Sequence, residues 1–572
     1  MMEMEVMMIT NIHPGIFLII CGIITAVMPE KWRKFFLIGC PAVTFLFAMQ
    51  LKIGDSAAIV LSEQYTLHYL EVTKENYIFL FVFSLMALIG GIYAAHNSNR
   101  LEAFASMGYA GGALGVTLAG GWLTLILFWE FMAVTSLFLI WGSHTKKATK
   151  AGFRYLLIHM LGGNLLLFGI LIKFFQGEPM IINLTGTHDI AFWLIFSGMA
   201  INAAIVPVHA WVPDAYPQGT VTGSVYLSSF TTKLAVLCLI RVFAGSQMLI
   251  VLGLIMILYG ACFALIENDI RRLLSYHIIS QLGFMVADVG LGTELAVNGA
   301  SALAFSNVLY KSLLFMCAGA IITATGIRKI NQLGGLAKKM PVLCIFFFVA
   351  ALSIAGVPLF CGFTCKSLSM TAAAGAGYHA VELLMMLGSI GTALSIPFKM
   401  GYFIFFGKDR NLSVKPIPKN MYAAMGIGAF CCILFGLAPN LVYRMLPYTM
   451  NYHPYGIAHI LEYVQLLPAA LLPFLMYLNK MEPHTALTLD TGWFARVPLK
   501  KFIHGISGFF FKVQELVDTN GRKVYRNLKR SFTDNTSARN ADTERRQIGE
   551  GMLAILIVII VVVLFILIKH MR

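Results

Sequence analysis

Four ionisable side chains lie inside long apolar stretches of this 572-residue sequence. The stretches are LILFWEFMAVTSLFLIWG around Glu130, TTKLAVLCLIR around Lys233, AFSNVLYKSLLFMCAG around Lys311 and PLFCGFTCKSLSM around Lys366. A charge at the centre of a bilayer costs about 2.5–3.5 kcal/mol even on insertion scales, so residues of this kind usually serve a function. Because carboxylates and amines bind and release protons, the four predict a line of protonatable groups at mid-membrane, with water bridging the longer gaps.

Each of these residues also has a structural alternative. Glu130 can be neutralised by its own proton or by a hydrogen bond to a nearby serine or threonine. Lys366 can stand near a helix end and extend its ammonium group to the interface, whereas Lys233 is too deep for that. Lys173 lies near the end of its apolar run and is expected to be an interfacial anchor.

The stretch Ile201–Arg241 places one of these charges beside a broken helix. Three prolines interrupt its first half: Pro207, Pro213 and Pro217. A proline removes a backbone donor and clashes with the preceding turn, so it kinks or ends a helix. A second break is expected at Gly356-Val357-Pro358, shortly before Lys366. Membrane transporters place ion paths at such discontinuous helices.

Other polar residues near these breaks have less specific interpretations. His209 and Asp214 lie in PVHAWVPDAYP, where irregular backbone needs polar partners. We expect Asp214 to cap or orient the loop rather than to carry protons. His159 and His277 lie near the ends of their spans and are expected to be structural.

The composition requires a membrane environment for these elements. The chain is 58% hydrophobic and 12% charged, whereas soluble proteins carry about 25% charged residues. Its net charge of +15 indicates basic cytoplasmic loops rather than a nucleic-acid partner. Runs long enough to cross about 30 Å of hydrocarbon number roughly sixteen. The prediction is therefore an all-α, polytopic membrane protein.

Basic loops alternate along the chain. Those after odd-numbered spans contain EKWRK, HTKKATKAGFR, ENDIRR, RKINQLGGLAKK and GKDRNLSVKPIPK. By the positive-inside rule the protein is a multi-pass protein of the plasma (inner) membrane, with its N-terminus outside and these loops in the cytoplasm. The segment after the last of the core spans mixes apolar and basic residues at helical spacing, which predicts an amphipathic helix lying along the membrane.

Two groups of about five spans, each with one broken helix, suggest a pair of inverted repeats. The predicted organisation is N-terminal transmembrane helices in 1–103, a first five-helix repeat in 104–244, a second in 245–406, additional transmembrane helices in 407–478, an amphipathic lateral segment in 479–551 and a terminal transmembrane helix in 552–572.

The sequence gives no sign of a redox centre of its own. Its ten cysteines lie mostly in apolar runs, and none has zinc or iron–sulfur spacing. Dinucleotide, P-loop, HExxH and GxSxG motifs are also absent from the sequence. We therefore expect no cofactor and no metal, and any redox chemistry would belong to partner subunits.

Five motifs together resemble a known family. The segment PVHAWVPDA (207–215) resembles the PxHxWxPDA signature of the proton-conducting antiporter-like subunits of respiratory complex I, membrane-bound hydrogenases and Mrp-type Na+/H+ antiporters. AGFRYLLIHMLGG (151–163), NDIRRLLSYHIISQLGFM (268–285) and NVLYKSLLFMCAGAI (307–321) match other stretches of that family, and LDTGWFAR (489–496) looks like its D-like members. The resemblance implies a core of about fourteen helices with two inverted five-helix repeats, plus a lateral helix that braces neighbouring subunits.

The resemblance also implies roles for the buried charges. It aligns Glu130 with the family's fifth-helix glutamate, Lys233 with the eighth-helix lysine, Lys311 with an eleventh-helix lysine and Lys366 with the twelfth-helix exit residue.

There is one departure from the family pattern. The family places a lysine in the broken seventh helix, where this sequence has Asn202, and histidines where it has Leu303 and Asn307. Asparagine cannot carry a proton. Either Glu130 then partners Lys233 instead, or the ion path is weakened and the role is partly structural.

Three functional hypotheses follow. The leading one is a proton-translocating membrane subunit of a larger respiratory, hydrogenase or Mrp-like complex, with exchange for Na+ left open. Its partners would be other membrane subunits and the lipid bilayer. The alternative is a non-pumping structural or coupling subunit that braces its partners. A self-contained quinone-reducing enzyme is disfavoured by the missing cofactor motifs.

Overall fold

The computed structural model of the chain describes residues 12–62, 65–97 and 99–483. The chain divides into two compact units, 1–492 and 493–572, and the second lies outside the described residues. Nearly all of the predicted lateral segment and the whole terminal span therefore also lie outside them.

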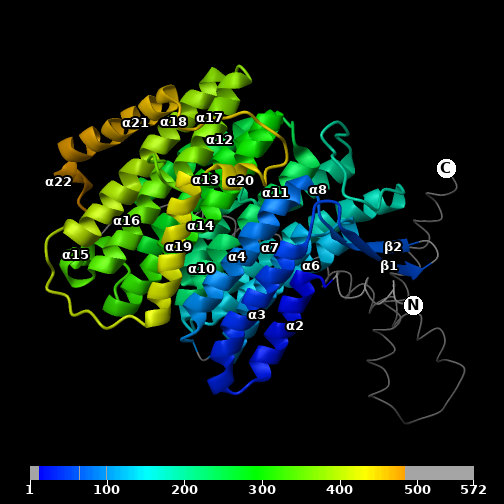
Figure 1. The fold of residues 1–572 in the computed structure, drawn as a ribbon, viewed down its shortest axis with the longest axis horizontal. Coiled ribbons are helices and arrows are strands. Elements are labelled where there is room, and N and C mark those ends of the chain that lie inside the picture. Colours follow the sequence, from blue (N-terminus) through cyan, green and yellow to red (C-terminus); the bar gives the residue numbers. More distant parts are fainter. Residues whose placement is uncertain (1–11, 63–64, 98, 484–572) are drawn as a thin grey trace, which may run out of the picture. The chain divides into compact units, whose positions relative to one another are not determined.

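The described chain is a bundle of helices (Figure 1). Its first part contains α2 (Pro14–Val27), α3 (Glu30–Gln50), α4 (Lys74–Ala94), α5 (Arg100–Thr117), α6 (Trp122–Trp141), α7 (Lys146–Phe175) and α8 (Ile190–Asn202). The broken region follows as η1 (Val208–Ala210), α9 (Trp211–Ala215), η2 (Tyr216–Gln218), α10 (Val221–Ser229) and α11 (Thr231–Phe243).

The later helices complete the bundle. They are α12 (Met248–Ile266), α13 (Ile270–Leu291), α14 (Glu294–Thr325), η3 (Ile330–Gln332), α15 (Leu336–Lys339), α16 (Pro341–Ala355), α17 (Cys361–Gly375), α18 (His379–Ala393), the π-helix η4 (Leu394–Phe406), α19 (Lys419–Leu437), α20 (Asn440–Tyr443), α21 (Ile457–Met476) and α22 (Leu478–Met481). Within the described residues, 10 helices are long and apolar enough to cross a membrane. The prediction of a multi-pass membrane protein is confirmed, and each apolar span predicted in this part coincides with a helix or a broken pair.

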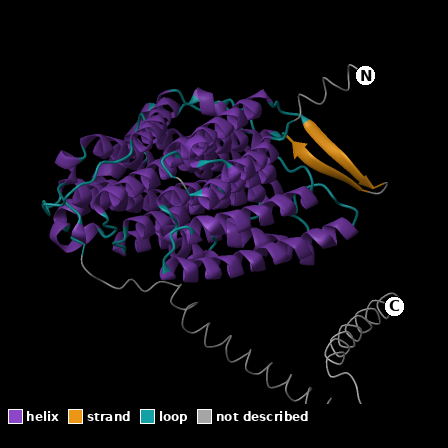
Figure 2. Ribbon diagram, turned by 90° about the horizontal axis from the view of Figure 1, so that it is seen from below, coloured by secondary structure: helices purple, strands orange, loops and turns teal. Residues whose placement is uncertain are grey.

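The all-α prediction needs one correction, a β-hairpin that stands out from the helices (Figure 2). The antiparallel strands β1 (Ser56–Ser62) and β2 (Tyr65–Glu71) occupy a stretch that was expected to be a polar connection. Its apolar run is far too short to span a membrane, so hydropathy alone could not identify it. Backbone hydrogen bonds join the hairpin to the bundle, including one of 2.8 Å from Glu71 N to Leu118 O.

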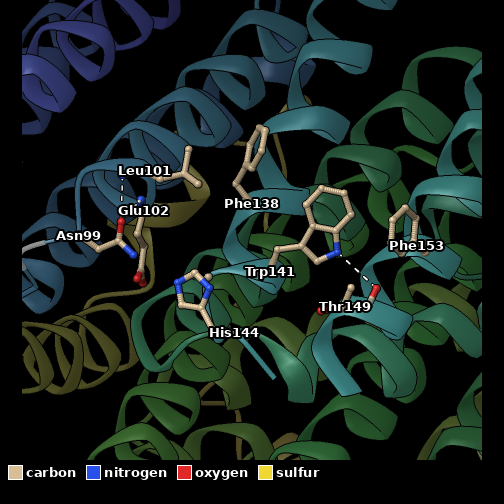
Figure 3. Close-up of a pocket in the computed structure, with 9 residues that line it drawn as sticks. Asn99, Leu101, Glu102, Phe138, Trp141, His144, Thr149 and Phe153 are labelled. Atoms are coloured by element: carbon tan, nitrogen blue, oxygen red, sulfur yellow. Dashed lines mark hydrogen bonds between the residues drawn. The ribbon is translucent and has the colours of Figure 1, made fainter. Parts of the chain in front are cut away.

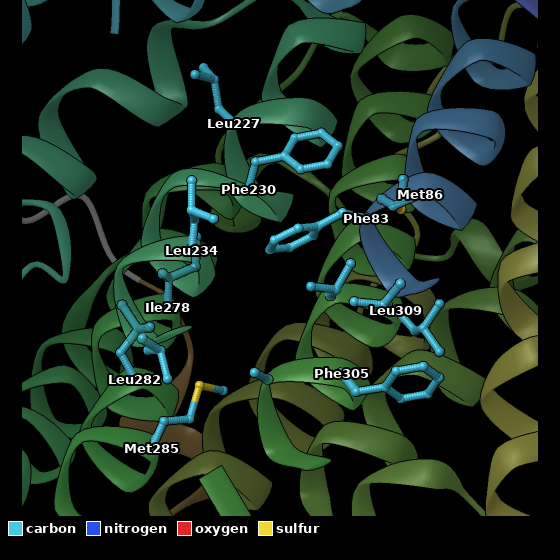
Figure 4. Close-up of a cluster of buried hydrophobic side chains, with 14 of the residues drawn as sticks. Phe83, Met86, Leu227, Phe230, Leu234, Ile278, Leu282, Met285, Phe305 and Leu309 are labelled. Carbon is cyan, nitrogen blue, oxygen red and sulfur yellow. The ribbon is translucent and has the colours of Figure 1, made fainter. Parts of the chain in front are cut away.

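The helices that carry Lys233 and Lys311 are among the most enclosed. Within Val221–Phe243 and Glu294–Thr325 the most apolar windows are 94% and 83% buried, against 17% for Ile457–Met476. Apolar side chains from α4, α10, α11, α13 and α14 fill the space between them (Figure 4), among them Phe83, Met86, Leu227, Phe230, Leu234, Ile278, Leu282, Met285, Phe305 and Leu309. This packing keeps bulk water away from the central helices.

Helices α12 and α13 approach each other through glycines. A Cβ on Gly283 would lie 2.5 Å from the carbonyl oxygen of Gly253, and a Cβ on Gly253 would lie 2.5 Å from that of Gly283. Small residues allow such close contact where no hydrophobic effect drives helices together in lipid. The loop after α13 begins at Gly292, whose φ of 66° suits glycine.

Replacing this glycine tests the packing. We expect Gly283→Leu to lower the stability of the bundle by about 1–3 kcal/mol or more, because the new side chain cannot fit without separating the two helices. The measurement is the thermal midpoint of the detergent-purified protein. The matched control is Gly39→Leu, since a Cβ at this exposed position in α3 has no heavy atom within 4 Å. Equal midpoints for the two variants would contradict the close contact.

Candidate functional site

The first break in the bundle is held by side chains from its own motif. Helix α8 ends at Asn202, and Trp211 Nε1 donates a 2.8 Å hydrogen bond to the carbonyl oxygen of Ile201. Arg154 on α7 forms a two-point ion pair with Asp214, at 2.6 and 2.9 Å. Asp214 therefore orients the irregular segment, which agrees with its predicted role.

A second interruption, at Phe230, was not expected. The sequence predicted one continuous span over 223–243, but the backbone at Phe230 (φ −104°, ψ −75°) separates α10 from α11. Lys233 Nζ donates a 2.6 Å hydrogen bond to the carbonyl oxygen of Ser228, in the last turn of α10. The lysine is fully buried, so the interruption provides an acceptor for its amine.

The predicted break at Gly356 holds a second lysine in the same way. Gly356 adopts a φ of 79° after the end of α16. Lys366 Nζ, on α17, donates a 2.8 Å hydrogen bond to the carbonyl oxygen of Ile354 and a longer one, 3.4 Å, to Ser389 Oγ. Its amine also lies 5.3 Å from the centre of the Phe284 ring, which favours a cation.

Lys311 lies between these two lysines. It is fully buried on α14, and its Nζ donates a 3.2 Å hydrogen bond to the carbonyl oxygen of Leu274 on α13. It is close enough to both Lys233 and Lys366 for their positive charges to interact with its own. The structure therefore brings three of the four predicted residues into one electrostatically connected row, which we call the lysine row (Lys233, Lys311 and Lys366).

One further lysine was missed. Lys399 lies in the π-helix η4, 3% exposed, and its Nζ donates to the carbonyl oxygens of Leu265 (2.5 Å) and Glu267 (2.8 Å) at the end of α12. A charge inside an apolar run was the signal that identified the other lysines, and it was present here too. His277, which bonds Ser395 Oγ at 2.6 Å, lies within electrostatic reach of Lys311, Lys366 and Lys399.

Glu130 stands apart from the lysine row. It is partly buried on α6, and a side chain on Gly163 of α7 would collide with its Oε1. Among the described residues, none forms a hydrogen bond or ion pair with its carboxyl group. The direct Glu130–Lys233 pairing that the sequence left open is therefore not present.

The positions that depart from the family pattern are filled by neutral groups. Asn202 is 2% exposed and its side chain meets the imidazole of His159. Leu303 is fully buried. Asn307 donates to the hydroxyl of Tyr310 at 3.1 Å.

Lys173 shows how the same protein pairs a buried lysine with acids. Its Nζ lies 3.2 Å from Asp189 and 3.3 Å from Glu178. Two carboxylates neutralise it at the end of α7, which agrees with its predicted role as an anchor.

A cavity of about 510 Å³ opens beside another buried acid (Figure 3). Glu102 is 6% exposed and accepts hydrogen bonds from the hydroxyls of Thr220, at 2.5 Å, and Thr222. His144 and Trp141 line the same cavity. Glu102 stands in the first turn of α5 and was not identified from the sequence.

Comparison with known proteins shows which family and which proteins the chain resembles. The family described as "NADH:quinone oxidoreductase/Mrp antiporter, TM" matches residues 119–395. The chain is similar to the M-type subunit of the F420H2 dehydrogenase of Methanosarcina mazei, with 30% identity over 58% of this chain and 72% of that protein. It is 28% identical to the D-type subunit of the Na+/H+ antiporter of Alkalihalophilus pseudofirmus, over 52% and 64% of the two chains.

Coverage of other relatives is partial. The chain is 29% identical to an uncharacterized protein of Mycobacterium tuberculosis and spans 58% of that protein's length.

Among solved structures, the chain resembles a chain of the archaeal membrane-bound sulfane sulfur reductase with a TM-score of 0.71 and 22% identity, over 96% of this chain and 99% of that one. A chain of the Mrp complex from Dietzia sp. gives 0.69 and 21%, over 82% and 99%. The chain belongs to the family of transmembrane subunits that NADH:quinone oxidoreductases share with Mrp antiporters.

Proposed function

We propose that this protein moves protons across the membrane along the lysine row, as one membrane subunit of a larger complex. One observation carries the proposal: within the described residues, no carboxylate lies within ion-pair distance of Lys233, Lys311 or Lys366, and their amines donate to a backbone carbonyl instead. Lys173, with two carboxylates, is the contrasting case in the same chain.

The kind of hydrogen-bond acceptor decides whether a buried lysine can change its protonation state. A carbonyl oxygen accepts a hydrogen bond from both an ammonium group and a neutral amine, whereas a carboxylate stabilises the ammonium form. A lysine held only by a carbonyl can therefore gain and lose a proton without losing its position. Repulsion between neighbouring positive charges is strong at low dielectric, so a proton arriving at one lysine favours release from the next.

We assign the two ends of the proton path from the family resemblance and from the positions of the buried residues. Lys366, at the second break, would release protons, and Lys399 is a further buried lysine near that end, with His277 within electrostatic reach of both. Glu130 would act at the other end. The breaks after α8 and α16 support the predicted pair of inverted five-helix repeats. The orientation, with the N-terminus outside and the basic loops in the cytoplasm, is proposed from the positive charge of those loops.

The larger complex is inferred from relatives. Their names include subunits of F420H2 dehydrogenase and of Na+/H+ antiporters, and the similar solved chains come from multi-component assemblies. Any electron transfer would belong to the partner subunits. A non-pumping bracing role is the second candidate, favoured by Asn202 and by the isolated position of Glu130.

Single replacements of the row separate these two functions. We expect Lys233→Ala, Lys311→Ala and Lys366→Ala each to lower proton translocation about tenfold or more, because each removes the amine that carries the proton at its step. The measurement is dye-reported acidification in proteoliposomes containing the purified complex. The control is Lys338→Ala, since this lysine is exposed on α15. If all three variants assemble and translocate like the wild type, the bracing role stands and transport is wrong.

The transported ion can be tested separately. Na+ is a hard cation that binds oxygen ligands, and a row of amines offers it none. We therefore expect proton translocation through this subunit to change less than about twofold when choline replaces Na+. Uptake of radioactive sodium measured in the same vesicles checks the result. Sodium uptake that Lys311→Ala abolishes would instead support Na+/H+ exchange along this path.

A further inference from the structure

Between Glu130 and the lysine row lies a group of buried hydroxyls that the proposed path has not used. We call it the hydroxyl cluster: Ser136 on α6, Tyr155 on α7, Tyr109 on α5, Tyr216 on η2 and Thr231 on α11. Each is at most 2% exposed. Five different elements thus converge on one polar point inside an otherwise apolar region, which is costly unless the groups bond to one another.

Hydrogen bonds join four of the five members of the cluster in two pairs. Tyr109 and Thr231 share a hydrogen bond of 2.6 Å between their hydroxyls, and the backbone N–H of Thr231 donates to the same phenol at 3.1 Å. Ser136 and Tyr155 share one of 2.7 Å. The hydroxyls of Tyr155 and Tyr216 are near enough to Thr231 to interact with it electrostatically, and among the described residues the Tyr216 hydroxyl has no hydrogen-bond partner.

One end of the cluster leads toward Glu130 along a single face of α7. Tyr155, His159 and Gly163 follow one another at intervals of four residues, so they lie above one another on that helix. The rings of Tyr155 and His159 are 4.0 Å apart, and His159 meets Asn202. Glu130 occupies the space that the missing side chain of Gly163 leaves open.

The other end reaches the lysine row. Thr231 is the first residue of α11, directly after the interruption at Phe230, and Lys233 follows within the same turn. Between them, the hydroxyl of Thr232 is buried without a hydrogen-bond partner in the described part of the chain. Thr231, whose hydroxyl bonds Tyr109, and Lys233, whose amine begins the row, thus lie in the same first turn of α11.

We infer that the hydroxyl cluster carries protons between the Glu130–His159 side and Lys233, at the step where Asn202 replaces the family's lysine. A hydroxyl both donates and accepts, so it takes a proton on one side while releasing its own on the other. The transfer runs from the protonated carboxyl group of Glu130, with the neutral imidazole of His159 as a relay, through the phenols and Thr231 to the neutral amine of Lys233. It leaves a carboxylate and an ammonium group, so charge and protons balance, and rotation of the hydroxyls resets the chain.

This inference rests on the proposed function, and hydroxyl-deleting variants with nearly unchanged shape test it. We expect Thr231→Val and Tyr155→Phe each to lower proton translocation by the purified complex about tenfold, with assembly intact. Thr231→Ser, which keeps the hydroxyl, should retain it. Tyr93→Phe is the matched control, because this buried phenol donates 2.9 Å to the carbonyl oxygen of Met316, away from the cluster.

A rescue distinguishes a proton path from a structural role. Adding Asn202→Lys to Thr231→Val restores an ionisable group at the family's position, and we expect it to recover transport without restoring the lost hydrogen bond. Wild-type transport by Thr231→Val and Tyr155→Phe, while Lys233→Ala remains inactive, would overturn the hydroxyl path and leave the proposed function standing. Loss in Tyr93→Phe equal to that in Tyr155→Phe, with no rescue, would also overturn it. If Lys233→Ala transports normally, the proposed function itself fails.

Discussion

The structure depends on how an amine is accommodated inside a membrane without a counter-charge. Three buried lysines, Lys233, Lys366 and Lys399, donate to carbonyl oxygens at the final turn of a neighbouring or preceding helix. Those carbonyls have no intrahelical partner, and they form the negative end of the helix dipole. Each helix interruption therefore creates the acceptor that its lysine needs. Lys311 is the exception, since its acceptor belongs to the interior of α13.

The interruptions themselves require support from the rest of the bundle. Irregular backbone at membrane depth persists only where protein rather than lipid surrounds it. The ion pair between Arg154 and Asp214, and the indole bond from Trp211, hold the first break in place. Glycine contacts between α12 and α13 bring the scaffold close enough to enclose the lysine-bearing helices. The packing that excludes water therefore also gives each buried polar contact its strength.

Much of this could be predicted from the sequence, and the failures have physical causes. Hydropathy identified the spans and the three lysines of the row, because each is a charge inside an apolar run, whereas Lys399 carries the same signal and was overlooked. The prolines at 207 and 213 indicated the first break, but nothing local marked Phe230, because that interruption depends on its surroundings. The hydroxyl cluster joins Tyr109 to Thr231 across 122 residues, a contact that no local pattern encodes. The β-hairpin was missed because its apolar run is short. The repeat boundaries remain a prediction.

The π-helix at Leu394–Phe406 has a consequence for comparing this chain with its relatives. A π-helical turn holds about one residue more than an α-helical turn, and each residue of an α-helix advances the side-chain direction by about 100°. A relative whose segment is plain α-helix would therefore point the residue aligned with Lys399 in a different direction. Gapless alignment through this segment would pair residues that face different surroundings. Equivalents of Lys399 should be sought by spatial superposition, because insertions of single residues here redirect a charge without changing the sequence around it.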